Sequence, residues 1–242
     1  MLLEARNVAK AFGTFRAVAG ADLTVEQGEI VGLIGPNGAG KSTFFNCLAG
    51  DTLPTTGRIL FDGADLTRAS PEAHARAGIG RTFQVPTTFA DMSVLANVMV
   101  GAFLRHPHRN DAREQARRII EMTGLRAEQP ARALGTPGRK RLEIARVLAT
   151  EPRLLLLDES LAGLTPSELQ EAIALVRCIH QMGVTIVIVE HIMEVIMTLT
   201  RRVLVFNQGR VISSGTPEQV VRDEAVIEAY LGRGARRQRE DS

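Results

Sequence analysis

The sequence predicts an α/β fold with a parallel-sheet core, an antiparallel β edge and an inserted helical segment. Three continuous apolar runs, at residues 29–35, 153–158 and 184–190, are typical of strands that are buried on both faces. A helical pattern separates the second run from the third. Strand, helix and strand in this order predict that the neighbouring strands are parallel.

The helix between the last two runs has recognisable start and stop signals. Thr165 is a favourable N-cap, Pro166 suits the first helical position, and Glu168 can complete a capping box with Thr165. The apolar residues that follow recur on one helical face, and the pattern stops at Gly183. A further helix is expected from about Lys41, after the first apolar run.

The flanking segments have different patterns. Residues 1–30 and 58–63 contain short strands with turns, which predicts an antiparallel sheet at the edge of the core. From Pro86 to about Leu134 only helical patterns appear, so we interpret residues 86–150, including the next helix, as a helical insertion. We expect one domain over residues 1–232 and a disordered polar tail over 233–242.

The composition restricts the class of protein. The chain has 242 residues, of which 45% are hydrophobic, enough for one large domain with a real core. Its 29 basic residues nearly balance 27 acidic ones, so no global field favours nucleic acid. Two distant cysteines predict a reduced, cytosolic chain, and the N-terminus lacks the apolar stretch of a signal peptide. The apolar runs are shorter than the roughly 20 residues of a membrane span, which leaves a place on a membrane protein's surface open.

A glycine-rich loop carries the most specific chemistry. The stretch GPNGAGKST fits the pattern G-x-x-x-x-G-K-[ST] between a predicted strand and a predicted helix. Backbone N–H groups of such a loop surround phosphate oxygens, and the positive end of the helix lies behind them. Lys41 is expected to reach the β- and γ-phosphates, and the Ser42 hydroxyl to bind Mg²⁺. The loop therefore predicts binding of a nucleoside triphosphate. Its residues are Gly35, Pro36, Asn37, Gly38, Ala39, Gly40, Lys41, Ser42 and Thr43.

Two carboxylates follow the second apolar run. Asp158 ends a buried strand, where it can hold the Mg²⁺ shell, and Glu159 can orient and deprotonate a water molecule. His191 follows the third run, where it can reach a γ-phosphate, and Gln84 ends a short strand before the helical insertion. These residues predict hydrolysis as well as binding.

The order of these features resembles the ATP-binding-cassette (ABC) ATPases, and the likeness covers nearly the whole chain. The resemblance implies a P-loop NTPase fold, with ATP and Mg²⁺ as cofactors. It implies that Phe12 stacks on adenine beside Val18, and that Gln84 senses both Mg²⁺ and the attacking water. The implied metal ligands are then Ser42, Gln84 and Asp158, and the implied catalytic residues are Glu159, His191 and Gln84.

Two regions of the chain depart from the family pattern. Ser160 stands where the family usually has Pro, and Thr165 where many members have Asp. The family signature, normally Leu-Ser-Gly-Gly-Gln, is matched only by the sequence LGTPG at residues 134–138. Gly135 replaces the serine hydroxyl and Pro137 has no N–H, so Gly135 and Gly138 are expected to form a weakened site for the γ-phosphate of a partner's ATP.

Several segments resemble the ATPase subunits of branched-chain amino acid importers, among them RTFQ, KRLEIARVLAT, LDESLAGLTPSE and the closing GTPEQVVRDEAVIEAYLG. Lipopolysaccharide-export ATPases share the AYLG-type ending, and a non-transport ABC ATPase is a further alternative. Gln84, Glu159 and His191 together argue against a small P-loop kinase or GTPase.

The resemblance also implies partners and a location. We expect integral membrane permease subunits, a second ATPase subunit in a homodimer or heterodimer, and a solute-binding protein that acts indirectly. We expect no nucleic acid partner, and a peripheral position on the cytoplasmic face of the inner membrane. The sequence does not select the transported substrate, because other subunits choose it.

Overall fold

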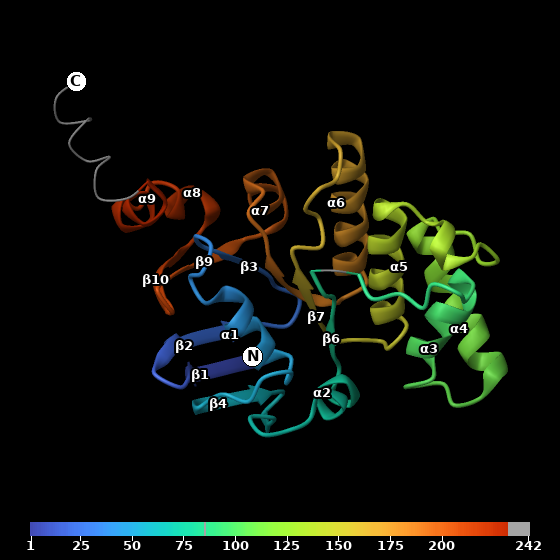
Figure 1. Cartoon of the computed structure of the whole chain (residues 1–242), viewed down its shortest axis with the longest axis horizontal. Helices are drawn as coiled ribbons and strands as arrows, with labels where there is room; N and C mark the ends of the chain where they lie inside the picture. Colours follow the sequence, from blue (N-terminus) through green and yellow to red (C-terminus); the bar gives the residue numbers. More distant parts are fainter. Residues whose placement is uncertain (85, 232–242) are drawn as a thin grey trace. The chain divides into compact units, whose positions relative to one another are not determined.

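The computed structural model describes residues 1–84 and 86–231. The chain forms two compact units. Figure 1 shows the helices and strands coloured by residue number. The first unit comprises Met1–Pro71 and the chain from Val187 onward, and the second comprises Glu72–Ile186. The expected tail at residues 233–242 lies outside the described residues.

An antiparallel sheet fills the N-terminal part of the first unit, with strand order β2-β1-β4-β5. In its register, Leu3 pairs with Val25 on one side and with Phe61 on the other. This sheet confirms the antiparallel β edge predicted from the sequence. The strands are β1 (Leu3–Phe12), β2 (Phe15–Val25), β4 (Thr56–Phe61) and β5 (Ala64–Asp65).

The first unit also contains parallel strands. Strand β3 (Ile30–Ile34) is buried at all five positions and pairs in parallel with β9 (Arg202–Asn207), which pairs antiparallel with β10 (Arg210–Gly215). Strand β8 (Thr185–Val189) is hydrogen-bonded to β3 and carries the chain from the second unit into the first. The helices of this unit are α1 (Lys41–Leu48), α7 (Met193–Leu199), α8 (Pro217–Val220) and α9 (Glu224–Leu231).

The second unit joins a short parallel ladder to a group of helices. Strand β6 (Ile79–Arg81) pairs in parallel with β7 (Leu154–Asp158), which is hydrogen-bonded to β8. Helix α3 packs against both α4 and α5, as Figure 1 shows in green and yellow-green. The helices are α2 (Pro71–Ala77), α3 (Val94–Ala102), α4 (Arg109–Thr123), a 3₁₀ turn (Ala131–Ala133), α5 (Thr136–Leu148) and α6 (Pro166–Gln181).

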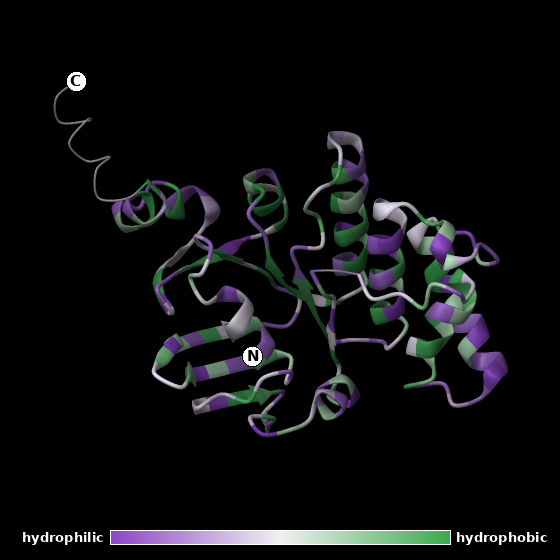
Figure 2. Ribbon diagram, viewed as in Figure 1, coloured by the Kyte–Doolittle hydropathy of each residue, from purple (hydrophilic) through white to green (hydrophobic). Residues whose placement is uncertain are grey.

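The hydropathy of the elements follows their burial. In Figure 2 strand β7 is continuously hydrophobic, whereas β1 and β2 alternate along their length. All five residues of β7 and all five of β8 are buried, as expected for strands covered on both faces. Within residues 1–84 and 86–231, no helix combines the length and the hydrophobicity that a bilayer crossing needs.

The predicted helix after Glu159 is confirmed in detail. The Thr165 hydroxyl accepts a hydrogen bond from the Glu168 N–H, and the Glu168 side chain accepts one from the Thr165 N–H. This capping box satisfies two N–H groups that no helical bond can reach. Pro166 opens the helix, as the sequence predicts.

One local prediction was wrong. Gln84 does not end a strand, because β6 stops at Arg81. The Thr82 N–H still bonds to the Leu156 carbonyl at 2.9 Å, but the Phe83 N–H bonds to the Glu143 side chain instead. A side-chain acceptor on α5 therefore ends the ladder, and Gln84 lies in the loop that follows. Helix α2 and the β9–β10 hairpin were not predicted either.

Candidate nucleotide-binding site

Two glycines of the glycine-rich loop have backbone conformations that favour glycine. Gly35 has φ +148° and Gly40 has φ +100°, in a region that other residues rarely adopt. A Cβ on Gly35 would lie 2.1 Å from the Phe206 carbonyl oxygen, and a Cβ on Gly40 would lie 2.3 Å from the Ala17 carbonyl oxygen. Only glycine fits at either position, so the close approach of the loop to Phe206 and Ala17 depends on these two residues.

The loop leads directly into α1. Gly40 is the N-cap of α1 and has no side chain to occupy the helix start. The first backbone bond of the helix runs from the Phe44 N–H to the Gly40 carbonyl at 2.9 Å. The preceding N–H groups therefore point out of the helix start, where the helix dipole also attracts an anion. Ser42 is exposed at this end.

Lys41 lies folded over the loop. Its ammonium group donates hydrogen bonds to the Gly35 carbonyl at 2.7 Å and to the Pro36 carbonyl at 3.0 Å. The side chain is buried, with only 8% of the residue exposed. A buried ammonium held on backbone carbonyls is a preformed cation in the phosphate loop.

A tyrosine in α9 also contacts the loop, which sequence reasoning missed. Tyr230 is the only tyrosine of the chain and forms a hydrogen bond with the backbone of Gly35. Burial raises the pKa of Tyr230, and this bond opposes the increase. The C-terminal helix thus supports the first residue of the phosphate loop. In the sequence, Tyr230 stands in the AYLG ending, which indicates the family resemblance but not this contact.

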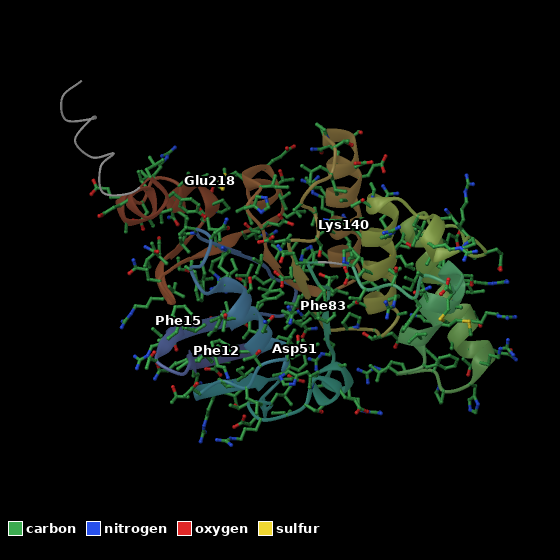
Figure 3. The ribbon with its side chains drawn as sticks, viewed as in Figure 1. Phe12, Phe15, Asp51, Phe83, Lys140 and Glu218 are labelled. Carbon is green, nitrogen blue, oxygen red and sulfur yellow. The ribbon has the colours of Figure 1, made fainter. Side chains whose placement is uncertain are left out.

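Two aromatic rings are exposed at the end of the β1–β2 hairpin. Phe12 and Phe15 pair directly across the ladder and are 53% and 65% exposed (Figure 3). The Lys10 ammonium lies 5.0 Å from the centre of the Phe12 ring. Either ring has a free surface on which a base could stack.

The role predicted for Val18 is not supported. Val18 has no exposed surface, so it presents nothing that a base could contact. Ala17 is buried beside it, because register shifts in the β1–β2 ladder disturb the usual alternation of inward and outward residues. Val18 belongs to the core beneath the hairpin.

His191 belongs to the same unit as the phosphate loop. It follows β8 and the buried Glu190, and its side chain is exposed. The strand thus ends in one buried and one exposed polar residue. An exposed imidazole at this position is available to a ligand.

In the second unit, β7 delivers both predicted carboxylates. Asp158 is its last residue and is only 5% exposed. The Arg81 guanidinium, at the end of neighbouring β6, donates to the Asp158 carboxylate at 3.1 Å. Sequence reasoning missed Arg81, although it stands in the quoted RTFQ segment.

Glu159 and Gln84 meet in the structure. The Gln84 amide donates from Nε2 to Glu159 Oε2 at 2.6 Å, although 75 positions separate the two residues. Glu159 has φ +45°, a left-handed conformation that is uncommon outside glycine. The backbone therefore turns sharply after Asp158 and directs the two adjacent carboxylates to different partners.

The unusual Ser160 has a local explanation. Its hydroxyl lies 2.6 Å from the Thr82 hydroxyl, and both residues are buried. Thr82 Oγ1 also accepts a hydrogen bond from the Asp158 N–H at 3.2 Å. The serine thus adds a bond between the segments that follow β6 and β7, which a proline could not make.

The signature-like turn forms the start of α5. Gly135 is the N-cap with φ −67° and ψ 175°, has no side-chain cap, and is exposed. Pro137 lies in the first turn of the helix, and the Arg139 Nε donates to the Leu134 carbonyl at 3.0 Å. As the sequence predicts, this helix start has no hydroxyl at its cap, and Pro137 removes one N–H donor.

Each of the three implied Mg²⁺ ligands carries an oxygen atom of the kind that this ion prefers. Ser42 in the first unit offers a hydroxyl, while Asp158 and Gln84 in the second offer a carboxylate and an amide oxygen. Among the described residues, no group of three or more His, Cys, Asp or Glu side chains could hold a metal ion. Mg²⁺ commonly binds to one or two protein oxygens, water and substrate phosphates, which suits a sparse oxygen set.

Comparison with known proteins shows the family to which the chain belongs. A family model described as ABC transporter matches residues 18–162, and the chain belongs to this family of ATPases. A second model, the branched-chain amino acid ATP-binding cassette transporter, matches residues 210–236. The chain is 37% identical to the high-affinity branched-chain amino acid transport ATP-binding protein BraF of Pseudomonas aeruginosa, with 96% of this chain and 98% of BraF covered.

Other relatives extend the comparison. LivG of Escherichia coli K12, also a high-affinity branched-chain amino acid transport ATP-binding protein, is 40% identical over 96% of this chain and 98% of its own length. The lipopolysaccharide export system ATP-binding protein LptB of Haemophilus influenzae is 34% identical, covering 96% and 97%. A crystal structure of a nucleotide-free ATP-binding cassette from an ABC transporter superposes with a TM-score of 0.88 at 30% identity, covering 96% of this chain and 99% of that chain. The predicted fold class is therefore confirmed.

Proposed function

We propose that this ATPase drives import of branched-chain amino acids, or of related small amino acids and amides, through a membrane permease. The match of residues 210–236 to the branched-chain amino acid model carries this proposal. The identities of 37% and 40% to BraF and LivG over nearly the whole chain support it. Export of lipopolysaccharide is the second candidate, because LptB of Haemophilus influenzae is 34% identical.

The residues of the two units divide the chemistry of hydrolysis. In the first unit, the loop Gly35–Thr43 binds the phosphates of ATP with Lys41, Phe12 stacks on the adenine, and His191 contacts the γ-phosphate. In the second, Glu159 accepts a proton from the attacking water, and the hydrogen bond from Gln84 orients its carboxylate. Ser42 of the first unit and Asp158 and Gln84 of the second would each offer Mg²⁺ an oxygen ligand, and the ion would neutralise charge on the phosphates.

The partners follow from this role. The chain acts at the cytoplasmic face of the membrane with permease subunits, and a solute-binding protein acts indirectly. Because Gly135 and Pro137 weaken the signature-like turn, we propose that the second ATPase subunit is a different chain with an intact signature. In such a heterodimer, the loop at Gly35–Thr43 faces that intact signature.

Reconstitution tests this function. The full chain is purified from its native membrane in mild detergent with its bound subunits and placed in vesicles with ATP. We expect ATP-dependent uptake of radiolabelled leucine in the presence of the solute-binding protein, and Lys41→Ala should abolish it. Hydrolysis stimulated by lipopolysaccharide and unaffected by amino acids would favour the second candidate. Purification without any integral membrane protein would overturn both.

A further inference from the structure

Three charged side chains share one face of helix α5. Lys140, Glu143 and Arg146 follow one another at intervals of three residues, a spacing that brings helical side chains onto the same side. Lys140 is 8% exposed and Glu143 is 4% exposed, which is unusual for charged residues. Buried charges need specific partners, and those partners show what this face of α5 does.

Lys140 holds the backbone that follows β7. Its ammonium group donates to the Ala162 carbonyl at 2.6 Å and lies 3.4 Å from the Glu159 carbonyl (Figure 3 labels Lys140). These two carbonyls belong to the turn in which Glu159 has its left-handed conformation. Lys140 therefore fixes the backbone on which the Glu159 side chain is mounted.

Glu143 holds the loop that carries Gln84. Its Oε1 accepts a hydrogen bond from the Phe83 N–H at 2.9 Å, one residue before Gln84. Burial raises the pKa of Glu143, while the N–H groups of Phe83 and Thr87 and the cations Arg146 and Lys140 oppose the increase. This carboxyl group is thus directed at the backbone on both sides of Gln84.

Arg146 anchors the far end of the same loop. Its guanidinium donates to the Thr87 carbonyl and lies 4.6 Å from the centre of the Phe89 ring. The loop is therefore held by α5 before Gln84 and after it. Gln84 in turn donates to Glu159, so the two segments that α5 holds also meet each other.

We propose that Lys140 and Glu143 are positioning residues for hydrolysis, which fix Glu159 and Gln84 relative to each other through α5, with Arg146 as the outer anchor. The inference rests on the proposed roles of Gln84 and Glu159. It adds that helix α5, which begins at the signature-like turn at Gly135, sets the geometry of both Gln84 and Glu159. Misplacing a catalytic group by about 1 Å can cost on the order of 10²-fold in rate.

Two matched substitutions at one position test the proposal. Glu143→Gln keeps an oxygen that accepts the Phe83 N–H, whereas Glu143→Leu removes it. We expect Glu143→Leu to lower kcat by roughly 10–100-fold with ATP affinity retained, since the ATP-binding loop lies elsewhere in the chain. Glu143→Gln should restore most of the rate. Arg141→Ala, which breaks a contact to Glu171 on α6, is the control on the same helix.

Hydrogen exchange supplies a readout that does not depend on turnover. In the assembled transporter, the Phe83 amide should exchange faster in Glu143→Leu than in Glu143→Gln or in Arg141→Ala. Lys140→Met should instead speed exchange around residues 160–163 and lower kcat, and it carries the test if Glu143→Leu fails to fold. Thermal unfolding identifies variants that have lost the fold.

The outcomes separate this inference from the proposed function. A folded Glu143→Leu with the parent's kcat and unchanged Phe83 exchange would overturn it, as would a folded Lys140→Met with the parent's kcat. If the parent itself does not hydrolyse ATP, the proposed function fails, and the exchange of Phe83 still decides whether Glu143 holds the loop. A fall in kcat that Glu143→Gln does not restore would also count against positioning through this hydrogen bond.

Discussion

The guanidinium of Arg81 is paired with the carboxylate of Asp158, with 3.1 Å between Nη2 and Oδ2. Both side chains are largely buried, at 12% and 7% exposure. The carboxylate that we assign to Mg²⁺ is therefore already balanced by a fixed cation. We expect Arg81→Met to lower the free energy of unfolding by about 3 kcal/mol, because it leaves a buried charge without this partner. Thermal or urea unfolding without nucleotide measures the loss.

The pairing also predicts a nucleotide effect. Mg²⁺–ATP should stabilise Arg81→Met more than it stabilises the parent, because the cation then replaces the missing guanidinium. Adding Asp158→Asn to Arg81→Met should recover much of the free energy of unfolding. It should also remove the extra stabilisation by Mg²⁺–ATP. If Mg²⁺–ATP stabilises the parent and Arg81→Met equally, Asp158 is not a ligand of the metal.

Glu159→Gln should bind ATP but lose most steady-state hydrolysis. An amide cannot accept the proton of the attacking water, and removing a general base typically costs about 10²–10⁴-fold. The amide oxygen can still accept the hydrogen bond from Gln84, so the loop should keep its place. Phosphate release and ATP affinity are the two measurements, with the exposed Glu128→Gln as the control. Hydrolysis within a few-fold of the parent would exclude Glu159 as the base.

Phe12→Ala should weaken ATP binding more than Phe15→Ala does. A base stacked on an aromatic ring contributes roughly 1–3 kcal/mol, judged from nucleic-acid binders. Because the two residues pair across the hairpin and both side chains are exposed, they form a matched pair of variants. Equilibrium binding of a fluorescent ATP analogue compares them directly. The reverse order of affinities would move the stacking role to Phe15.

Gly135→Ser should raise the ATPase activity of the isolated chain, which we expect to be low. A hydroxyl donor to a charged phosphate oxygen contributes roughly 1.5–3 kcal/mol. A Cβ at Gly135 meets only the Pro137 Cδ at 3.8 Å, so serine fits without strain. Gly135→Ala supplies the Cβ without the hydroxyl and is the control. Rapid hydrolysis by the unmodified chain, with no gain in Gly135→Ser, would show that the turn is competent already.

The position of Gly138 is less suited to restoration. A Cβ there would lie 3.0 Å from the Leu134 Cδ2, so glutamine at this position forces Leu134 to move. We therefore expect that adding Gly138→Gln to Gly135→Ser raises the ATPase activity less than Gly135→Ser raises it alone. Thermal unfolding of the two variants should show the cost of the crowding at Leu134.

The two cysteines should react with a thiol reagent at very different rates. Cys47 is buried in α1, and burial raises its pKa to about 11, so it holds almost no thiolate at pH 8. Cys178 is exposed. An Ellman titration at pH 8 should count one thiol in the folded protein and two after unfolding. Rapid reaction of both thiols before unfolding would show that α1 opens locally.

Much of the fold follows from local patterns. The phosphate loop, the capped helix after Thr165 and the buried strand before Asp158 each depend on residues adjacent in sequence, so their signals can be read there. Gln84 was placed wrongly because β6 ends where the Phe83 N–H bonds to Glu143, which lies 60 positions after Phe83. The burial of Val18 could not be predicted because register shifts put two consecutive residues into the core.

The sequence by itself determined the chemistry that this protein has available: a loop of glycines around Lys41, two carboxylates at the end of a strand, and a helix start without a hydroxyl at Gly135. These features depend on backbone conformations and residue types that short segments specify. Only the tertiary structure decided which groups act together. Gln84 bonds to Glu159, and Arg81 bonds to Asp158. Lys140 donates to the Ala162 carbonyl, and Glu143 accepts from the Phe83 N–H. Such pairs join residues that lie up to 77 positions apart. Burial gives the charges of Arg81, Asp158, Lys140 and Glu143 few alternative partners, so packing of the unit selects those pairs.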